Sequence, residues 1–153
     1  MLRLPSAPRR LVIVADNSLI VDAVRIGFRE SGEVNLVGYT NGHTTTARTI
    51  LDAQPLAILL DDMDQSEGSI ELLQAIRSED RKVAVLVLTD ELAEDWLDHV
   101  FGAGATAVIS KSTPPAALAT LVRETLNGHI VHRPSPAHDR SPAVDAEMPR
   151  ACR

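Results

Sequence analysis

The chain has 153 residues, 44% of them hydrophobic and 24% charged, which suits a single domain with a hydrophobic core and excludes a largely disordered chain. The longest apolar runs are too short to cross a bilayer and residues 1–10 lack a signal-peptide core, so we expect a cytoplasmic protein with no membrane partner. Residues 11–128 hold eight Lys/Arg against eighteen Asp/Glu, an acidity that repels a phosphate backbone and argues against nucleic acid as a ligand of this segment.

Short apolar runs rich in branched residues recur along the chain, at 11–15, 34–39, 56–60, 83–88 and 106–109. These runs are continuous instead of alternating with polar residues. Continuous runs are typical of strands that are buried on both faces of a parallel sheet. We therefore predict five strands, most of them buried.

Between and after these runs, apolar residues recur at helical spacing. In the first such segment Ile20, Val24 and Phe28 stand four residues apart. The predicted helices are 18–30, 44–53, 70–78, 92–101 and 114–126.

Strands that alternate with helices imply right-handed crossovers and a parallel sheet with helices on both faces. The expected fold is α/β: a doubly wound, five-stranded parallel sheet in a three-layer sandwich spanning 11–128. Residues 1–10 are expected to be flexible, and the proline-rich residues 129–153 to form a disordered tail or linker. The only cysteine, Cys152, lies in that tail and excludes an internal disulfide.

In an open parallel sheet, ligands bind beyond the carboxyl ends of the strands. The residues expected there include Asp16, Asp61, Thr89 and Lys111. Two carboxylates suit Mg²⁺, and one of them could be a nucleophile toward a phosphoryl group. A hydroxyl and an ammonium group would then bind the phosphoryl oxygens.

Several short motifs at these strand ends, taken together and in order, carry a family resemblance. They are Val-Ala-Asp-Asn-Ser at 14–18, Ala-Ile-Leu-Leu-Asp at 57–61, Val-Leu-Thr at 87–89, Gly-Ala-Gly-Ala at 102–105 and Ile-Ser-Lys-Ser-Thr-Pro at 109–114. With these motifs, residues 11–128 resemble a response-regulator receiver domain, CheY-like and flavodoxin-like in fold, and the NarL/FixJ type most of all.

The resemblance implies a role for each residue that matches the family pattern. Asp61 would accept a phosphoryl group from a sensor histidine kinase in two-component signal transduction. Asp16 and Asp61, with the backbone carbonyl of Met63, would hold Mg²⁺. Thr89 would bond the phosphoryl group and swing inward on activation, and Lys111 would pair with its oxygens.

The resemblance also implies partners and an output. Phosphorylation would change a face formed by the fourth helix, fifth strand and fifth helix, which would bind an output protein or domain and could support a homodimer. Such a domain catalyses its own phosphorylation without being a turnover enzyme. The chain is either a stand-alone receiver or part of a transcription regulator with a separate DNA-binding domain.

The sequence departs from the family pattern at three places. Ala15 replaces the first residue of the acidic pair, which removes a negative charge and should weaken Mg²⁺ binding. Asp64-Gln65 replaces Met-Pro in the loop after the acceptor, where Gly68 also falls one place early. Val108 stands where the fifth strand usually carries an aromatic ring, so the usual hydroxyl-aromatic coupling cannot operate.

Other interpretations of the site residues remain open at this point. Asp62 could be the acceptor if the strand ends one residue later. Asp16 and Thr89 could be helix caps, Lys111 a surface lysine, and Trp96 either a packing residue or an exposed docking ring.

Two other functions also remain open. One is an atypical pseudo-receiver that acts as a phosphorylation-independent interaction or dimerisation module, which the three departures favour. The other is an aspartate-nucleophile phosphatase of the same architecture, which the absence of a second acid/base motif disfavours.

Overall fold

The computed structural model describes residues 9–29 and 34–128, with the side chains of Ser18 and Ile20 left out. The predicted tail and Cys152 lie outside the described residues. The elements follow one another as β1 (Arg9–Ala15), α1 (Ser18–Phe28), β2 (Val34–Asn41), α2 (Ala47–Asp52), β3 (Ala57–Asp61), α3 (Glu67–Glu79), β4 (Ala84–Thr89), α4 (Glu94–Gly102), β5 (Ala107–Ser110) and α5 (Pro115–Leu126). This alternation confirms the predicted elements.

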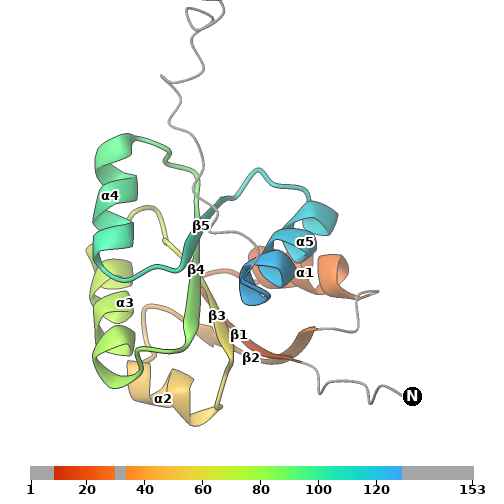
Figure 1. Ribbon diagram of the computed structural model, residues 1–153, viewed down its shortest axis with the longest axis horizontal. Coiled ribbons are helices and arrows are strands. Elements are labelled where there is room, and N and C mark those ends of the chain that lie inside the picture. Colours follow the sequence, from red (N-terminus) through yellow and green to blue (C-terminus); the bar gives the residue numbers. More distant parts are fainter. Residues whose placement is uncertain (1–8, 30–33, 129–153) are drawn as a thin grey trace, which may run out of the picture.

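The five strands form one parallel sheet in the order β2-β1-β3-β4-β5. Figure 1 shows α1 and α5 together on one face of this sheet and α2, α3 and α4 on the other. The predicted doubly wound, three-layer fold is therefore confirmed. Strand order reverses between β1 and β3, the position at which ligands bind in such sheets.

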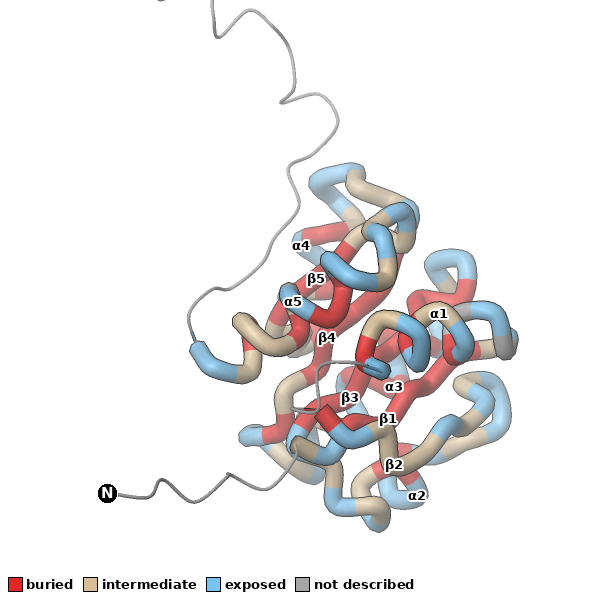
Figure 2. Tube along the Cα trace, turned by 90° about the vertical axis from the view of Figure 1, so that its right-hand side faces the viewer, coloured by how far each residue is buried: buried red, intermediate tan, exposed pale blue. Residues whose placement is uncertain are grey.

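Alternate residues of each central strand feed two separate cores. Val12, Ile58 and Val85 face α2, α3 and α4, whereas Leu11, Leu59 and Leu86 face α1 and α5. The buried trace in Figure 2 runs along the strands and the inner sides of the helices. Burial on both faces explains why the strands appear in the sequence as continuous apolar runs.

Several element ends differ from the predictions. β1 begins at Arg9, where it pairs with Val34, so Arg9 and Arg10 belong to the sheet and not to a flexible segment. α3 begins at Glu67 because the Ser66 hydroxyl accepts a hydrogen bond from the Ser69 amide and caps the helix. The predicted start at Ile70 followed the apolar pattern, which does not record the cap.

At the amino ends of β4 and β5, the guanidinium group of Arg77 from α3 binds the two chain segments that precede these strands. Its Nε donates to the Gly104 carbonyl at 2.6 Å, Nη1 to the Val83 carbonyl, and Nη2 to the Thr106 hydroxyl at 2.9 Å. We call these four residues the Arg77 cluster. Gly104 has a φ of +115°, and a Cβ there would collide with the Arg77 side chain.

Candidate functional site

The carboxyl ends of β3, β4 and β5 bring together four polar side chains, Asp61, Asp62, Thr89 and Lys111. Asp61 is the last residue of β3 and Thr89 the last of β4, while Lys111 directly follows β5. Asp61 and Asp62 are each 1% exposed and Thr89 is fully buried. We call this group the Lys111 cluster.

Lys111 lies between the two carboxylates of this cluster. Its Nζ is 2.6 Å from Oδ1 of Asp61 and 2.8 Å from Oδ1 of Asp62. Its side chain is only 18% exposed, so Lys111 is not a surface lysine. The sequence predicted Asp61 and Lys111 at the same edge of the sheet, and the structure places Lys111 in contact with both Asp61 and Asp62.

Thr89 is joined to the cluster through Asp62. Its hydroxyl donates to Oδ2 of Asp62 at 2.5 Å, and accepts hydrogen bonds from the Glu91 amide at 3.0 Å and from Nε1 of Trp96 at 3.1 Å. Thr89 does not cap α4, because that helix has Ala93 as its N-cap. Trp96 is therefore more than a packing residue, because its indole nitrogen donates a hydrogen bond to the Thr89 hydroxyl.

The electrostatics of the cluster follow from burial and from its charges. Burial raises the pKa of Asp61 and the charge of Asp62 acts in the same direction, while Lys111 and the Met63 amide oppose them. Burial alone would lower the pKa of Lys111, but its hydrogen bonds and charge contacts with Asp61 and Asp62 outweigh this and raise it. One ammonium group thus faces two buried carboxylates.

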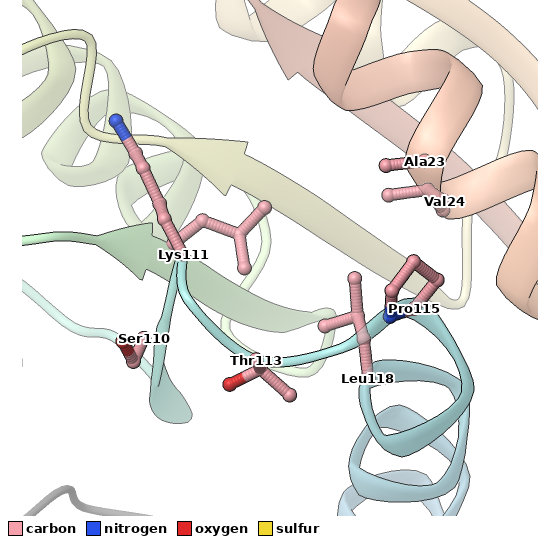
Figure 3. A pocket seen from close by; sticks show the side chains of 8 residues that line it. Ala23, Val24, Ser110, Lys111, Thr113, Pro115 and Leu118 are labelled. Atoms are coloured by element: carbon pink, nitrogen blue, oxygen red, sulfur yellow. The ribbon is translucent and has the colours of Figure 1, made fainter.

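The apolar side of Lys111 is packed against α1 and α5. A small cavity of about 60 Å³ lies there, lined by residues that include Val24, Pro115 and Leu118. Figure 3 shows the ammonium nitrogen of Lys111 extended away from these side chains. The stem of Lys111 therefore lies beside apolar surface while its charge reaches the carboxylates.

Asp16, the predicted metal ligand after β1, has other partners. Its Oδ2 is 3.3 Å from Nε2 of His43, and its Oδ1 accepts a hydrogen bond from the Asn17 side chain at 3.2 Å. Asp16 does not cap α1, because it is the Asn17 side chain that accepts the Leu19 amide. The Asp16 side chain is 27% exposed, so this part of the site is open to water.

The loop after β3 has an unusual backbone. Met63, Asp64 and Gln65 have φ angles of 48°, 61° and 59°, in the left-handed region that residues other than glycine rarely adopt. The Met63 side chain is buried against Gly42, where a Cβ would lie 2.4 Å from its sulfur. A proline at position 65 could not adopt this backbone, because its ring fixes φ at about −65°.

Two contacts of the site were missed in the sequence. Asp61 pairs with Leu88 across the sheet, so the next residues, Asp62 and Thr89, lie side by side. The sequence places both residues at strand ends, but it does not contain the register that makes them neighbours. The His43–Asp16 pair has no comparable sequence signal, because it depends on the turn after β2.

Val108 and Ala15 occupy apolar positions in the structure. Val108 is fully buried among the residues that face α2, α3 and α4, and Ala15 is fully buried in the core beneath α1 and α5. No aromatic ring of β5 therefore lies near Thr89, and the indole of Trp96 from α4 contacts it instead. Within the described residues, no group of three or more His, Cys, Asp or Glu side chains is arranged to hold a metal ion.

No protein-family model matches this chain, and no curated protein matches it either. Solved structures do. The receiver domain of the putative response regulator NarL from Mycobacterium tuberculosis is 22% identical, with a TM-score of 0.70 over 79% of this chain and 98% of that one. A LuxR-family two-component response regulator from Aurantimonas has 21% identity and a TM-score of 0.70 over 95% of this chain and 98% of that one.

A third similar structure is the isolated receiver domain of RcsB from Salmonella enterica serovar Typhimurium, solved in the presence of the phosphomimetic BeF₃⁻. It is 16% identical, with a TM-score of 0.67 over 82% of this chain and 94% of that one. In the described residues, no helix is both long and apolar enough to span a membrane. The chain has the fold of response-regulator receiver domains.

Proposed function

We propose that this protein is a receiver of two-component signal transduction, phosphorylated on Asp61. One observation carries the proposal: the buried carboxylate of Asp61, at the carboxyl edge of the sheet, lies 2.6 Å from the partly buried ammonium group of Lys111. An Asp61 oxygen would form a bond to phosphorus while the bond from phosphorus to the histidine nitrogen of a kinase breaks. The imidazole would leave with the electron pair of that bond.

Mg²⁺ would be held by hard oxygen ligands at the same edge of the sheet. The donors are the carboxylates of Asp16 and Asp61 and the carbonyl of Met63, a set that suits an ion that keeps several waters. The partial exposure of Asp16 fits this requirement for water. When bound, Mg²⁺ offsets the negative charge of the phosphoryl group, and Ala15 leaves the pocket with one carboxylate fewer.

The remaining parts of the proposal concern partners and place. The donor is a sensor histidine kinase, and the output protein or domain binds the face of α4, β5 and α5, which could also serve a homodimer. The Thr89–Trp96 hydrogen bond supports α4 as part of that output. The domain undergoes self-catalysed phosphotransfer in the cytoplasm without turnover, and itself binds no nucleic acid.

The test is intact-mass measurement after incubation with acetyl phosphate and Mg²⁺. Wild type, Asp61→Asn and Asp62→Asn are compared, with acetate as the leaving group. A single phosphoryl adduct lost only in Asp61→Asn is expected. An adduct lost only in Asp62→Asn would move the acceptor by one residue, and no adduct on any variant would refute phosphorylation.

A second candidate function is a pseudo-receiver that binds its partner without phosphorylation. The observation that favours it is the Lys111 cluster itself, in which Thr89 and Lys111 already have a carboxylate partner in Asp62. Absence of any adduct, combined with a Trp96 fluorescence that does not respond to beryllofluoride, would favour this second function.

A further inference from the structure

The Asp62 carboxylate holds the two groups that a phosphoryl group on Asp61 would need. Its Oδ2 accepts the Thr89 hydroxyl at 2.5 Å, and its Oδ1 lies 2.8 Å from Nζ of Lys111. A transferred phosphoryl group requires hydrogen-bond donors and positive charge around its oxygens. In the Lys111 cluster, the hydroxyl of Thr89 and the ammonium group of Lys111 are already bound to the Asp62 carboxylate.

The backbone of Asp62 is held on both sides, so its carboxylate cannot move with the loop. Its amide donates to the Leu88 carbonyl at 2.9 Å, which extends the pairing of β3 with β4, and its carbonyl accepts the Ser66 amide at 3.0 Å. The carboxylate can therefore leave Thr89 and Lys111 only by rotation of the side chain.

The charges in the cluster favour competition over sharing. Lys111 already faces two carboxylates, and a phosphoryl group adds between one and two further negative charges. Oδ1 of Asp62 is buried, and the contact that the structure gives it is with Nζ of Lys111 at 2.8 Å. A second anion on Asp61 would take that charge contact away.

We propose that Asp62 is an internal competitor of the phosphoryl group, so that phosphorylation of Asp61 requires the Asp62 carboxylate to release Thr89 and Lys111. This inference rests on the proposed function and names a residue that sets how readily the site is phosphorylated. Because of this competition, the chain would stay unphosphorylated at phosphodonor concentrations that are sufficient to phosphorylate a site without Asp62.

Trp96 provides a reporter for this exchange. Its Nε1 donates to the Thr89 hydroxyl, the same atom that donates to Asp62, and it is the only tryptophan of the chain. When Thr89 changes its acceptor from Asp62 to a phosphoryl oxygen, the surroundings of the indole change. Fluorescence of the unmodified full chain therefore follows the exchange directly.

The test is a titration of the full chain with beryllofluoride in the presence of Mg²⁺, followed by Trp96 fluorescence, with acetyl phosphate labelling followed by intact mass in parallel. Asp62→Asn removes the competing charge and keeps the size of the side chain. We expect its half-saturating beryllofluoride concentration to fall, and its labelling rate to rise, by about tenfold relative to wild type.

The matched control is Asp64→Asn, which makes the same change in charge in the same loop on an exposed side chain. It should behave as wild type. Equal half-saturation and labelling in wild type and Asp62→Asn would overturn the inference, and so would an equal gain in Asp64→Asn, which would reveal a general charge effect.

Failure of the proposed function is distinguishable from failure of the inference. Loss of labelling in every variant, wild type included, refutes phosphorylation, whereas labelling of wild type and Asp62→Asn at one rate refutes only the competition. If thermal unfolding shows that Asp62→Asn does not fold, Asp62→Ser takes its place. Serine carries no charge, and the same tenfold gain is expected.

Discussion

Strands β3, β4 and β5 hold one partly buried cation at each end, and the two cations have partners of different charge. At the amino ends, the Arg77 cluster surrounds a guanidinium group with carbonyl and hydroxyl oxygens. At the carboxyl ends, the Lys111 cluster surrounds an ammonium group with two carboxylates. The partners of Arg77 are neutral, whereas the partners of Lys111 are charged.

This difference in charge separates a structural role, that of the Arg77 cluster, from a functional one, that of the Lys111 cluster. Arg77 joins α3 to the segments before β4 and β5 with acceptors that have no second state. The Lys111 cluster has several states, because burial raises the pKa of Asp61 toward protonation and the side chain of Asp62 can rotate away from its partners. A cluster with surplus negative charge suits a site of chemistry, and a satisfied neutral cluster suits a structural joint.

The largest effect should come from Arg77→Ala. It leaves the carbonyls of Val83 and Gly104 without their donor, and we expect unfolding free energy to fall by about 3–4 kcal/mol. Urea unfolding followed by circular dichroism measures it, with exposed Arg81→Ala as the control, expected within about 0.5 kcal/mol of wild type. Equal losses in the two variants would show that Arg77 does not fasten α3.

Lys111→Met should cost somewhat less, about 2–3 kcal/mol at neutral pH. It leaves two buried carboxylates without their cation. Protonation of Asp61 can relieve this loss, whereas the carbonyls around Arg77 cannot be protonated. The loss should therefore shrink as the pH falls toward 4, whereas the Arg77→Ala loss should not. Urea unfolding at a series of pH values compares the two, with exposed Lys82→Met as the control; parallel pH profiles would contradict the distinction.

The pH dependence of the wild type should show the raised pKa of Asp61 in metal-free buffer. Because the folded state holds this proton more tightly than the unfolded state, stability falls as the pH rises from about 4 through the raised pKa. Lys111 acts at the alkaline end of the pH range. Its contribution to folding stability is complete below about pH 10.4 and is lost as the pH rises through its raised pKa.

Asp61→Asn should remove the first of these two changes. The stability of Asp61→Asn relative to wild type should therefore grow as the pH rises above about 4 and then level off. Urea unfolding in EDTA at several pH values measures this difference. A difference that shrinks with rising pH would mean that the pKa of Asp61 is lowered.

The smallest effect should come from His43→Ala. The His43 side chain is 54% exposed and its contact with Asp16 is 3.3 Å, so the pair should contribute less than about 0.5 kcal/mol. Thermal unfolding at pH 6 and pH 8 checks this. A loss above about 1 kcal/mol would show that the His43–Asp16 pair contributes more to stability than an exposed pair does.

The fold was predictable because most of the strands are buried on both faces and so carry continuous apolar runs, β2 being the exception. The placement of Asp61 and Lys111 at the same edge of the sheet was predictable for the same reason, since both residues directly end or follow such runs. Element ends were less predictable where a polar cap decides them, as Ser66 does for α3.

The rest of the cluster depends on register and on packing, which a single sequence does not contain. Asp62 reaches Thr89 only because Asp61 pairs with Leu88. Trp96 reaches the same hydroxyl only because of the way α4 packs against the sheet, and the periodicity of the helix does not contain that information.

The burial of Asp61 and Asp62 also constrains how the chain can be made. A ribosome delivers β3 well before Lys111, so a nascent chain that closed its sheet early would trap two carboxylates without their cation, at a cost of several kcal/mol. The carboxyl edge must then stay hydrated until β5 emerges. Final closure therefore waits for nearly the whole domain, and a prematurely terminated chain remains open to proteases.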